Sequence, residues 1–489
     1  MPHDGKLHQP AEKTSVPGLP RIVFTLILVA LITSVLCQRS AAQTQSAPQA
    51  AAQAQAAPDQ SAAADRAAGS SWLFPVDKLN AVLPSWLRIG GDYRDRFEGL
   101  VGVGFGSARD SILLDRLHVN AAIQPESWLL FFGEVQDSRI FLNQRVATSI
   151  TYQDTWTLWQ AYAQVGSSTS GWIDVLAGRQ VLRFGDERVI GPSPWNNVGR
   201  TFDVARIDLH HPGFKVSLFS ASVVPPSNAY LHGAIAGDNL HGAYGSFQSV
   251  IPRGVFEPYV LWHLAPASFS LPETVGKNHL NDVTLGVHLK GKLPYALDYN
   301  TEWDAQTGSL GGKSIAAWAG YTALGKTFPA VTLRPRLFAE LNLASGTKNL
   351  SGNRWNTFDQ IYPSNHDKYG FADQAGRRNL EQSRAGVEET VTKRWNIRQA
   401  FEGLWLFTSG DNFYSSSGGI AVAAHPGAPR HIGNELDLTS VYEFEKGLDC
   451  GFGYARLFAG AFLRTASQGR DYNYPYAFVE YKFSRIASQ

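Results

Sequence analysis

The stretch RLHVNAAIQPESWLLFFGEVQD, Arg116 to Asp137, decides the fold. Before its proline, apolar residues from Leu117 to Ile123 alternate with polar ones, and after it the apolar row continues from Leu129 to Val135. A period of two is typical of β-strands, and a short proline-containing break between two such runs is typical of a hairpin. The stretch therefore predicts two antiparallel strands whose apolar row faces either a protein core or lipid.

Alternating runs of this kind recur from Trp72 to the C-terminus, and no segment between them has the pattern of a long amphipathic helix. Short breaks such as QPES, HPG and IPRG alternate with long ones such as the stretch from Ser345 to Gln382. That rhythm is typical of an outer-membrane barrel, which has short periplasmic turns and longer extracellular loops. The runs number about 18 by the period-two criterion. We therefore expect an all-β fold, a transmembrane antiparallel up-and-down β-barrel with a lumen wide enough to hold water.

A soluble all-β enzyme, built as a β-helix or a propeller, is the alternative architecture. Its apolar rows would face a protein core. The chain shows no repeat of fixed length, which counts against both of these folds.

The N-terminus carries the longest apolar run, IVFTLILVALITSVL at residues 22–36, followed by Ser40-Ala41-Ala42. At about 15 residues this run is short for a membrane-spanning helix. We expect a Sec signal peptide over residues 1–42, an Ala- and Gln-rich disordered periplasmic leader over 43–71, and the barrel over 72–489. Cys450 would then be the only cysteine of the mature chain, which excludes an internal disulfide.

The total charge is nearly zero, with 43 Lys and Arg against 42 Asp and Glu. A nucleic-acid-binding protein usually carries a strong basic excess, so no nucleic acid is expected as a partner. Only the local arrangement of charges can therefore indicate function.

Strand parity predicts which charges face the lumen, because the apolar parity would face lipid. The expected pore-lining arginines are Arg88, Arg94, Arg96, Arg116, Arg206, Arg334, Arg336 and Arg398. Arginine binds carboxylates bidentately, which favours a path for anions. The alternative is that these arginines only pair with carboxylates across the strands of the wall. An acidic run from Asp298 to Asp304 also makes part of the lumen negative.

Catalytic and metal-binding patterns are weak in this sequence. His210-His211 precedes a turn proline, His366-Asp367 is an isolated pair, and Asp186-Glu187 would point to opposite faces of a strand. No G-x-S-x-G, Walker or H-E-x-x-H motif is present. We expect neither catalytic residues nor a metal or cofactor.

Two longer blocks, residues 177–209 and 356–388, go beyond general barrel features. Their distinctive positions include Arg179, Gln180, Asp186, Arg188, Trp195, Asn197, Arg200, Asp203 and Arg206 in the first block, and Asp359, Tyr362, Asn365, His366, Tyr369, Asp373, Arg378 and Asn379 in the second. In these positions the chain resembles the alginate export family of outer-membrane porins. Arg179 shares parity with Ile173 and Val175, so placing it in the lumen requires a bulge or a change of strand face.

The resemblance implies a monomeric barrel of about 18 strands whose arginine-containing pore, partly closed by loops, passes an anionic uronate polymer. The expected function is passive diffusion of an alginate-like polysaccharide or oligosaccharide across the outer membrane of a Gram-negative cell. A general or small-anion porin is one alternative, and an outer-membrane surface hydrolase is another. The expected partners are the anionic cargo, outer-membrane lipids, and periplasmic export or assembly proteins.

Overall fold

The computed structural model describes residues 75–143, 151–167, 171–227, 233–248, 250–266, 279–445 and 447–483. The signal peptide and leader predicted over residues 1–71 lie outside these ranges. Within the described ranges, no helix is long and apolar enough to span a membrane.

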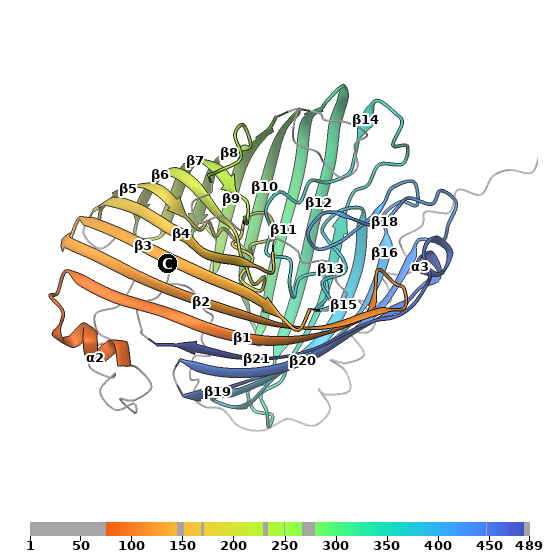
Figure 1. Ribbon diagram of the computed structural model, residues 1–489. Coiled ribbons are helices and arrows are strands. Elements are labelled where there is room, and N and C mark those ends of the chain that lie inside the picture. Colours follow the sequence, from red (N-terminus) through yellow and green to blue (C-terminus); the bar gives the residue numbers. More distant parts are fainter. Residues whose placement is uncertain are drawn as a thin grey trace, which may run out of the picture. The chain divides into compact units, whose positions relative to one another are not determined.

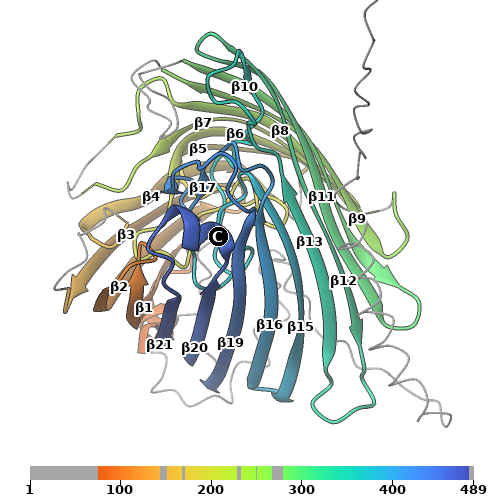
Figure 2. The ribbon, with the colours of Figure 1, turned by 90° about the vertical axis from the view of Figure 1, so that its right-hand side faces the viewer.

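Eighteen long antiparallel strands form a closed barrel (Figure 1, Figure 2). They are β1 (Leu87–Val103), β2 (Ala108–Glu126), β3 (Leu129–Phe141), β4 (Asp154–Gly166), β5 (Ile173–Gln180), β6 (Thr201–His211), β7 (Phe214–Val224), β8 (Asn239–Phe247), β9 (Gly254–Ala265), β10 (Leu280–Leu293), β11 (Leu297–Leu310), β12 (Lys313–Thr327), β13 (Arg336–Ala344), β15 (Leu380–Thr392), β16 (Trp395–Leu406), β19 (His431–Glu445), β20 (Leu448–Ala459) and β21 (Tyr472–Lys482). The sheet closes because β1 pairs with both β2 and β21. The predicted fold and strand number are confirmed.

The remaining elements are short. Helix α2 (Pro75–Val82) precedes β1, and α3 (Ala461–Ala466) lies between β20 and β21. Strand β14 (Arg354–Trp355) pairs in parallel with β12, and β17 (Phe413–Tyr414) pairs with β18 (Ile420–Val422). All three short strands belong to long loops at one end of the barrel, which we call the loop end. The opposite end, where short turns join the strands, is the turn end.

Strand parity separates the two faces of the wall as the sequence predicts. In the opening hairpin, Val119 and Val135 are 37% and 38% exposed on the outer face, whereas the residues before them, His118 and Glu134, are 8% and 1% exposed on the inner face. The turn is tighter than QPES, because β2 continues to Glu126 and β3 begins at Leu129. Apolar residues therefore cover the outside, as a lipid-facing barrel requires.

One of the predicted lumen residues is wrong, and one family-block residue lies on the outer face. Arg334 is exposed in the turn before β13, with φ of 43°, so it belongs to no strand face. Arg179 lies on the outer face of β5, where its guanidinium binds Asp203 of β6 bidentately at 2.9 and 3.2 Å. Parity alone was correct for Arg179: no bulge within β5 turns it into the lumen.

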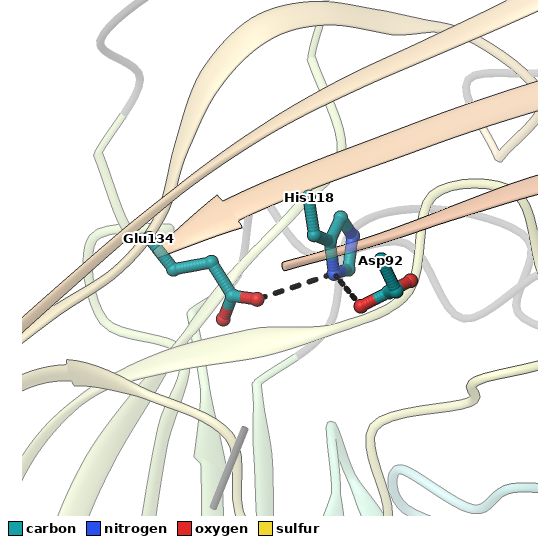
Figure 3. A group of neighbouring side chains, drawn as sticks. All are labelled: Asp92, His118 and Glu134. Atoms are coloured by element: carbon teal, nitrogen blue, oxygen red, sulfur yellow. Dashed lines mark ion pairs between the residues drawn. The ribbon is translucent and has the colours of Figure 1, made fainter. Parts of the chain in front are cut away.

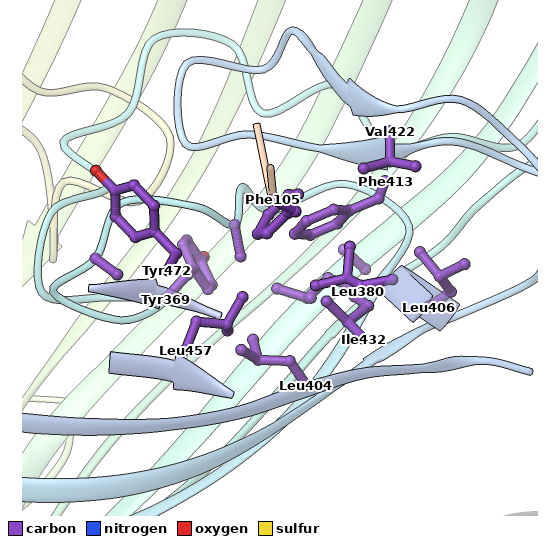
Figure 4. Packing of buried hydrophobic residues seen from close by; sticks show 14 of the residues in the cluster. Phe105, Tyr369, Leu380, Leu404, Leu406, Phe413, Val422, Ile432, Leu457 and Tyr472 are labelled. Atoms are coloured by element: carbon purple, nitrogen blue, oxygen red, sulfur yellow. The ribbon is translucent and has the colours of Figure 1, made fainter. Parts of the chain in front are cut away.

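A large hydrophobic cluster lies inside the barrel, where loop residues pack on the inner face of the wall. Phe105, Tyr369 and Phe413 from loops contact strand residues such as Leu404 and Leu457, and all five are at most 1% exposed (Figure 4). Nearer the turn end, Phe132 packs with Tyr162 and Leu176 on neighbouring strands. Apolar packing thus fixes the loops against the wall, in addition to the strand hydrogen bonds.

Candidate functional site

Three loops fold into the barrel, and we call them inner loops 1, 2 and 3. Inner loop 1 is residues 181–200 between β5 and β6, inner loop 2 is residues 345–379 between β13 and β15, and inner loop 3 is residues 407–430 between β16 and β19. Inner loops 1 and 2 carry most of the two sequence blocks that distinguish this chain from a generic barrel.

Three of the predicted pore arginines hold inner loop 1 by its backbone. Arg94 donates to the carbonyl oxygens of Pro194, Trp195 and Asn196 at 3.0, 3.0 and 3.2 Å, and Arg116 donates to that of Pro194 at 2.9 Å. Arg96 also donates to the Trp195 oxygen. Buried carbonyls need donors, and a guanidinium supplies several in a fixed plane. These arginines therefore satisfy loop carbonyls and are not free to meet cargo.

The other side of inner loop 1 reaches β13. Arg188 donates to Glu340 Oε1 at 2.7 Å and to Asn342 Oδ1 at 2.9 Å, and its guanidinium lies 3.6 Å from the centre of the Tyr321 ring. Going round the barrel by the shorter way, five strands separate β13 from β1. A segment tied to both walls must cross the lumen, so inner loop 1 narrows the barrel.

Inner loop 2 packs against inner loop 1 by backbone pairing. Ile190 and Tyr362 form a parallel bridge, in which Gly191 N donates to Tyr362 O at 2.8 Å and Tyr362 N donates to Val189 O at 2.9 Å. A Cβ at Gly191 would lie 2.3 Å from Ser364 Oγ, so only glycine permits this approach. The two sequence blocks, far apart in the chain, therefore form one interlocked unit.

Side chains strengthen the same contact. The rings of Trp195 and His366 stack with centroids 4.0 Å apart and planes 3° apart, and the Arg96 guanidinium lies 4.0 Å from the Trp195 centroid. Arg200 donates to the carbonyl oxygens of Gly191 and Pro363, each at 3.1 Å. Stacking of a ring between a guanidinium and an imidazole favours both contacts.

The acidic run of β11 is neutralised from the loop side and from the next strands. Arg377 of inner loop 2 binds Glu302 at 3.0 Å and Asp304 at 2.7 Å, and Arg336 binds Asp298 at 2.6 Å. The buried part of this run, Glu302 and Asp304, therefore binds inner loop 2.

Inner loop 3 is held by two asparagines of inner loop 2. Asn379 donates to Thr408 O at 3.0 Å and to Asn412 O at 2.9 Å, and Asn365 donates to Ser416 O at 2.6 Å. The three inner loops consequently form one hydrogen-bonded assembly inside the barrel.

The structure places the family-block residues in three groups. Arg188, Trp195, Arg200, Asn365, His366 and Asn379 tie loop to loop or loop to wall, as does Asp186 through Arg188 at 2.9 Å and Lys368 at 3.6 Å. Gln180 is buried at the end of β5, and Arg179 and Asp203 pair on the outer face. Asp186 and Glu187 lie in inner loop 1 and not on a strand, which corrects the prediction made for that pair.

The remaining predicted arginines lie nearer the turn end, and most pair with carboxylates. Arg206 lies 3.2 Å from Asp208, Arg336 also binds Glu388 at 3.0 Å, and Arg398 lies 3.4 Å from Asp367 and 3.5 Å from Glu388. Arg88 donates to the carbonyl oxygens of Pro84 and Leu87.

Two lysines at the turn end were not predicted. Lys290 and Lys292 follow buried His288 on the same parity of β10, and both are exposed towards the lumen. Neither forms an ion pair with a described residue within 4.0 Å. The alternation in VHLKGK predicts that both lysine side chains point into the lumen. Only the structure shows that the nearby carboxylates pair with other residues. The two lysines lie at the same end of the barrel as Arg336 and Arg398, which pair with Asp298 and Glu388. We call these six residues the turn-end mouth.

Charged groups of inner loop 2 are stabilised in their ionised forms. Burial raises the pKa of Asp359, but hydrogen bonding to His263 outweighs it, and the net pKa is lowered. Burial also raises the pKa of Asp367, but the positive charges of Lys368 and Arg398 have the larger effect, and the net pKa is lowered. Burial lowers the pKa of Lys368, but the negative charges of Asp367 and Asp186 outweigh burial, and the net pKa is raised. The loop assembly therefore depends on ionised side chains.

The weak metal and catalytic patterns gain no support as sites. His210 pairs with Asp174 at 3.1 Å near a turn, and His366 Nδ1 lies 2.8 Å from Asp373. Each of these histidines has one carboxylate partner at hydrogen-bond distance.

Solved structures with the same fold come from Pseudomonas aeruginosa. OccK11 (OpdR) is 12% identical with a TM-score of 0.51, covering 81% of this chain and 95% of that one. OpdQ is 11% identical with a TM-score of 0.54 over 81% and 97% of the two chains. OccK2 (OpdF), solved in complex with glucuronate, is 11% identical with a TM-score of 0.52 over 82% and 98%. No curated protein matches the sequence. The family model described as alginate export matches residues 85–478, so the chain belongs to the alginate export family.

Proposed function

We propose that this barrel is an outer-membrane channel that passes an anionic, uronate-containing polysaccharide or oligosaccharide by passive diffusion. Family membership supports a transport channel rather than an enzyme. The fold it shares with porins supports the same conclusion, and one of those porins was crystallised with a uronate, glucuronate.

The turn-end mouth is the observation that carries the choice of an anionic cargo. Its two arginines pair with Asp298, Glu388 and Asp367, whereas Lys290 and Lys292 have no described carboxylate within 4.0 Å. Such a field concentrates anions and raises their rate of entry. Because short turns of these barrels face the periplasm, the mouth is where cargo would enter during export.

The inner loops would act as the size filter. Inner loop 1 is tied to two separate parts of the wall by Arg94 and Arg188, which leaves a narrower path than an open barrel of about 18 strands would give. Only an extended chain or a small solute would fit such a path. A folded or branched polymer would be excluded.

Single-channel recordings in a planar bilayer test the proposal. The wild type is expected to prefer anions and to be blocked by oligouronates added on the turn-end side. Lys290→Gln with Lys292→Gln should weaken the block several-fold, because two unpaired cations are lost. The matched control is Lys393→Gln with Arg394→Gln, which removes two positive charges from the exposed turn after β15.

Each other result contradicts a definite part of the proposal. A cation-selective channel would exclude an anionic cargo. An anion-selective channel that oligouronates do not block would favour a general or small-anion porin. Cleavage of polysaccharide by the purified barrel would favour the hydrolase alternative.

A further inference from the structure

Three lumen-facing residues on adjacent strands lie together in the wall of β1, β2 and β3. Asp92 of β1 is paired in register with His118 of β2, and His118 is paired with Gln136 of β3. Glu134 lies two residues before Gln136 on the same face of β3, so its carboxylate points towards His118 (Figure 3). One ligand atom from each of Asp92, His118 and Glu134 falls within 4.8 Å of the others. The strand register thus creates a group of one imidazole and two carboxylates.

The distances in this group differ from those of hydrogen bonds. His118 Nδ1 lies 3.3 Å from Glu134 Oε1 and 3.7 Å from Asp92 Oδ2, and neither contact is a hydrogen bond. Charge-assisted N–H···O bonds are usually about 2.7–2.9 Å long. Ligand bonds of about 2.1 Å in a tetrahedron place neighbouring ligand atoms about 3.4 Å apart. The two spacings from His118 Nδ1 are close to that value, and all three ligand atoms lie within 4.8 Å of one another.

Other buried histidines of the lumen show what a hydrogen-bonded pair looks like here. His288 Nδ1 lies 2.5 Å from Glu257, and His263 Nε2 lies 3.0 Å from Asp238. By contrast, His118 makes its one hydrogen bond through Nε2, 2.8 Å from Gln136 Oε1. With that oxygen facing it, Nε2 donates the hydrogen, which leaves Nδ1 as the ring nitrogen that faces the two carboxylates and could bind a metal ion.

The surrounding oxygens lack donors. Asp92 Oδ1, Glu134 Oε1 and Asn120 Oδ1 are buried and receive no hydrogen bond from any described residue. Asn120 is directly cross-strand from Glu134 and is 3% exposed. Arg116 Nη2 lies 3.6 Å from Asp92 Oδ1, and its cross-strand neighbour Arg94 also faces Asp92. Buried acceptors without donors favour a bound cation.

We propose that Asp92, His118 and Glu134 bind a divalent transition-metal ion, with Asn120 as a neighbouring oxygen donor. One imidazole nitrogen and two carboxylate oxygens suit Zn²⁺ or Mn²⁺ better than Ca²⁺ or Mg²⁺, which prefer oxygen alone. The supporting shell is present: Gln136 orients the His118 ring, and Gln160 donates to Glu134 Oε2 at 2.5 Å. The ion would join three strands beside Arg116, which holds inner loop 1.

Zinc binding to the purified barrel tests the site. The EDTA-treated wild type should bind one Zn²⁺ in calorimetry, and crystals grown with zinc should give one anomalous peak between His118 Nδ1 and the two carboxylates. Glu134→Gln keeps the side-chain shape but should lower the affinity at least tenfold. Glu257→Gln is the matched control, because it removes a carboxylate from a hydrogen-bonded histidine pair and should bind zinc as the wild type does.

The anomalous map keeps the test valid even if Glu134→Gln fails to fold, because it uses the wild type. No peak at the site in zinc-grown crystals would overturn the proposal. Equal zinc affinity in wild type and folded Glu134→Gln would overturn it as well. In either case the group would be only a polar contact between the three strands.

Discussion

Arg377 is only 1% exposed, yet it carries a full charge from inner loop 2 into the acidic run of β11. Removing one member of a buried ion group leaves the other charges uncompensated, which costs about 3–5 kcal/mol. Arg377→Met should therefore lower the free energy of unfolding by roughly that amount, because Glu302 and Asp304 lose their shared partner. Urea unfolding in detergent micelles measures the change.

A matched variant separates charge burial from loss of an arginine. Arg183→Met removes the same residue type from inner loop 1, where Arg183 pairs with Glu187 at 2.8 Å but is 34% exposed. An exposed pair of this kind contributes less than about 1 kcal/mol. If both variants lose equal stability, the buried docking of Arg377 onto β11 is not what stabilises inner loop 2.

The outer face carries a second informative pair, Arg179 and Asp203. Asp203→Leu alone should destabilise the barrel, because Arg179 loses its carboxylate partner on the outer face, at a cost up to about 2–4 kcal/mol depending on depth. Adding Arg179→Leu should restore most of the loss, since no charge remains. Refolding into lipid vesicles measures both variants. A double variant as unstable as the single one would contradict this account.

At the scale of elements, inner loop 1 is held at its tip by Arg94, Arg96 and Arg116. Replacing Arg94 and Arg96 by glutamine removes donors to the carbonyls of Pro194, Trp195 and Asn196, so the tip should detach from the wall. The expected result is a larger and noisier single-channel conductance with little change in ion selectivity. Lys290→Gln is the contrasting variant, and it should change selectivity without added noise. Reduced anion preference without larger conductance would instead make these arginines pore-lining.

The strands could be predicted from the sequence, whereas the inner loops could not. Alternation is a local property, and it locates β2 and β3 because their outward residues are mostly apolar and their inward residues are mostly polar. The contact of Trp195 with His366, or of Arg94 with Pro194, depends on how a long loop folds back into the barrel. The periodicity of the sequence does not predict such contacts. The same holds for Asp92, His118 and Glu134: parity places each in the lumen, but only the register of three strands brings them together.

As a whole, the molecule consists of a hydrogen-bonded barrel and an assembly of inner loops held largely by charged side chains. The two parts should respond differently to acid. Asp359 and Asp367 have lowered pKa values in the folded loops. Each therefore contributes stability above its unfolded pKa of about 3.9, and that stability is lost as the pH falls through the folded value. Strand hydrogen bonds do not titrate, so the barrel should persist.

We therefore expect the conductance of the open channel to rise as the pH falls below about 4, when the loops detach, and to recover on return to neutral pH. Asp367→Asn should raise conductance already at neutral pH, because Lys368 and Arg398 lose the carboxylate between them. Glu126→Gln, at the exposed turn end of β2, is the control and should follow the wild type. Recordings between pH 7 and pH 3 (roughly the range over which carboxylates protonate) measure the effect. A conductance that stays constant over that range would show that packing, and not charge, holds the inner loops in the lumen.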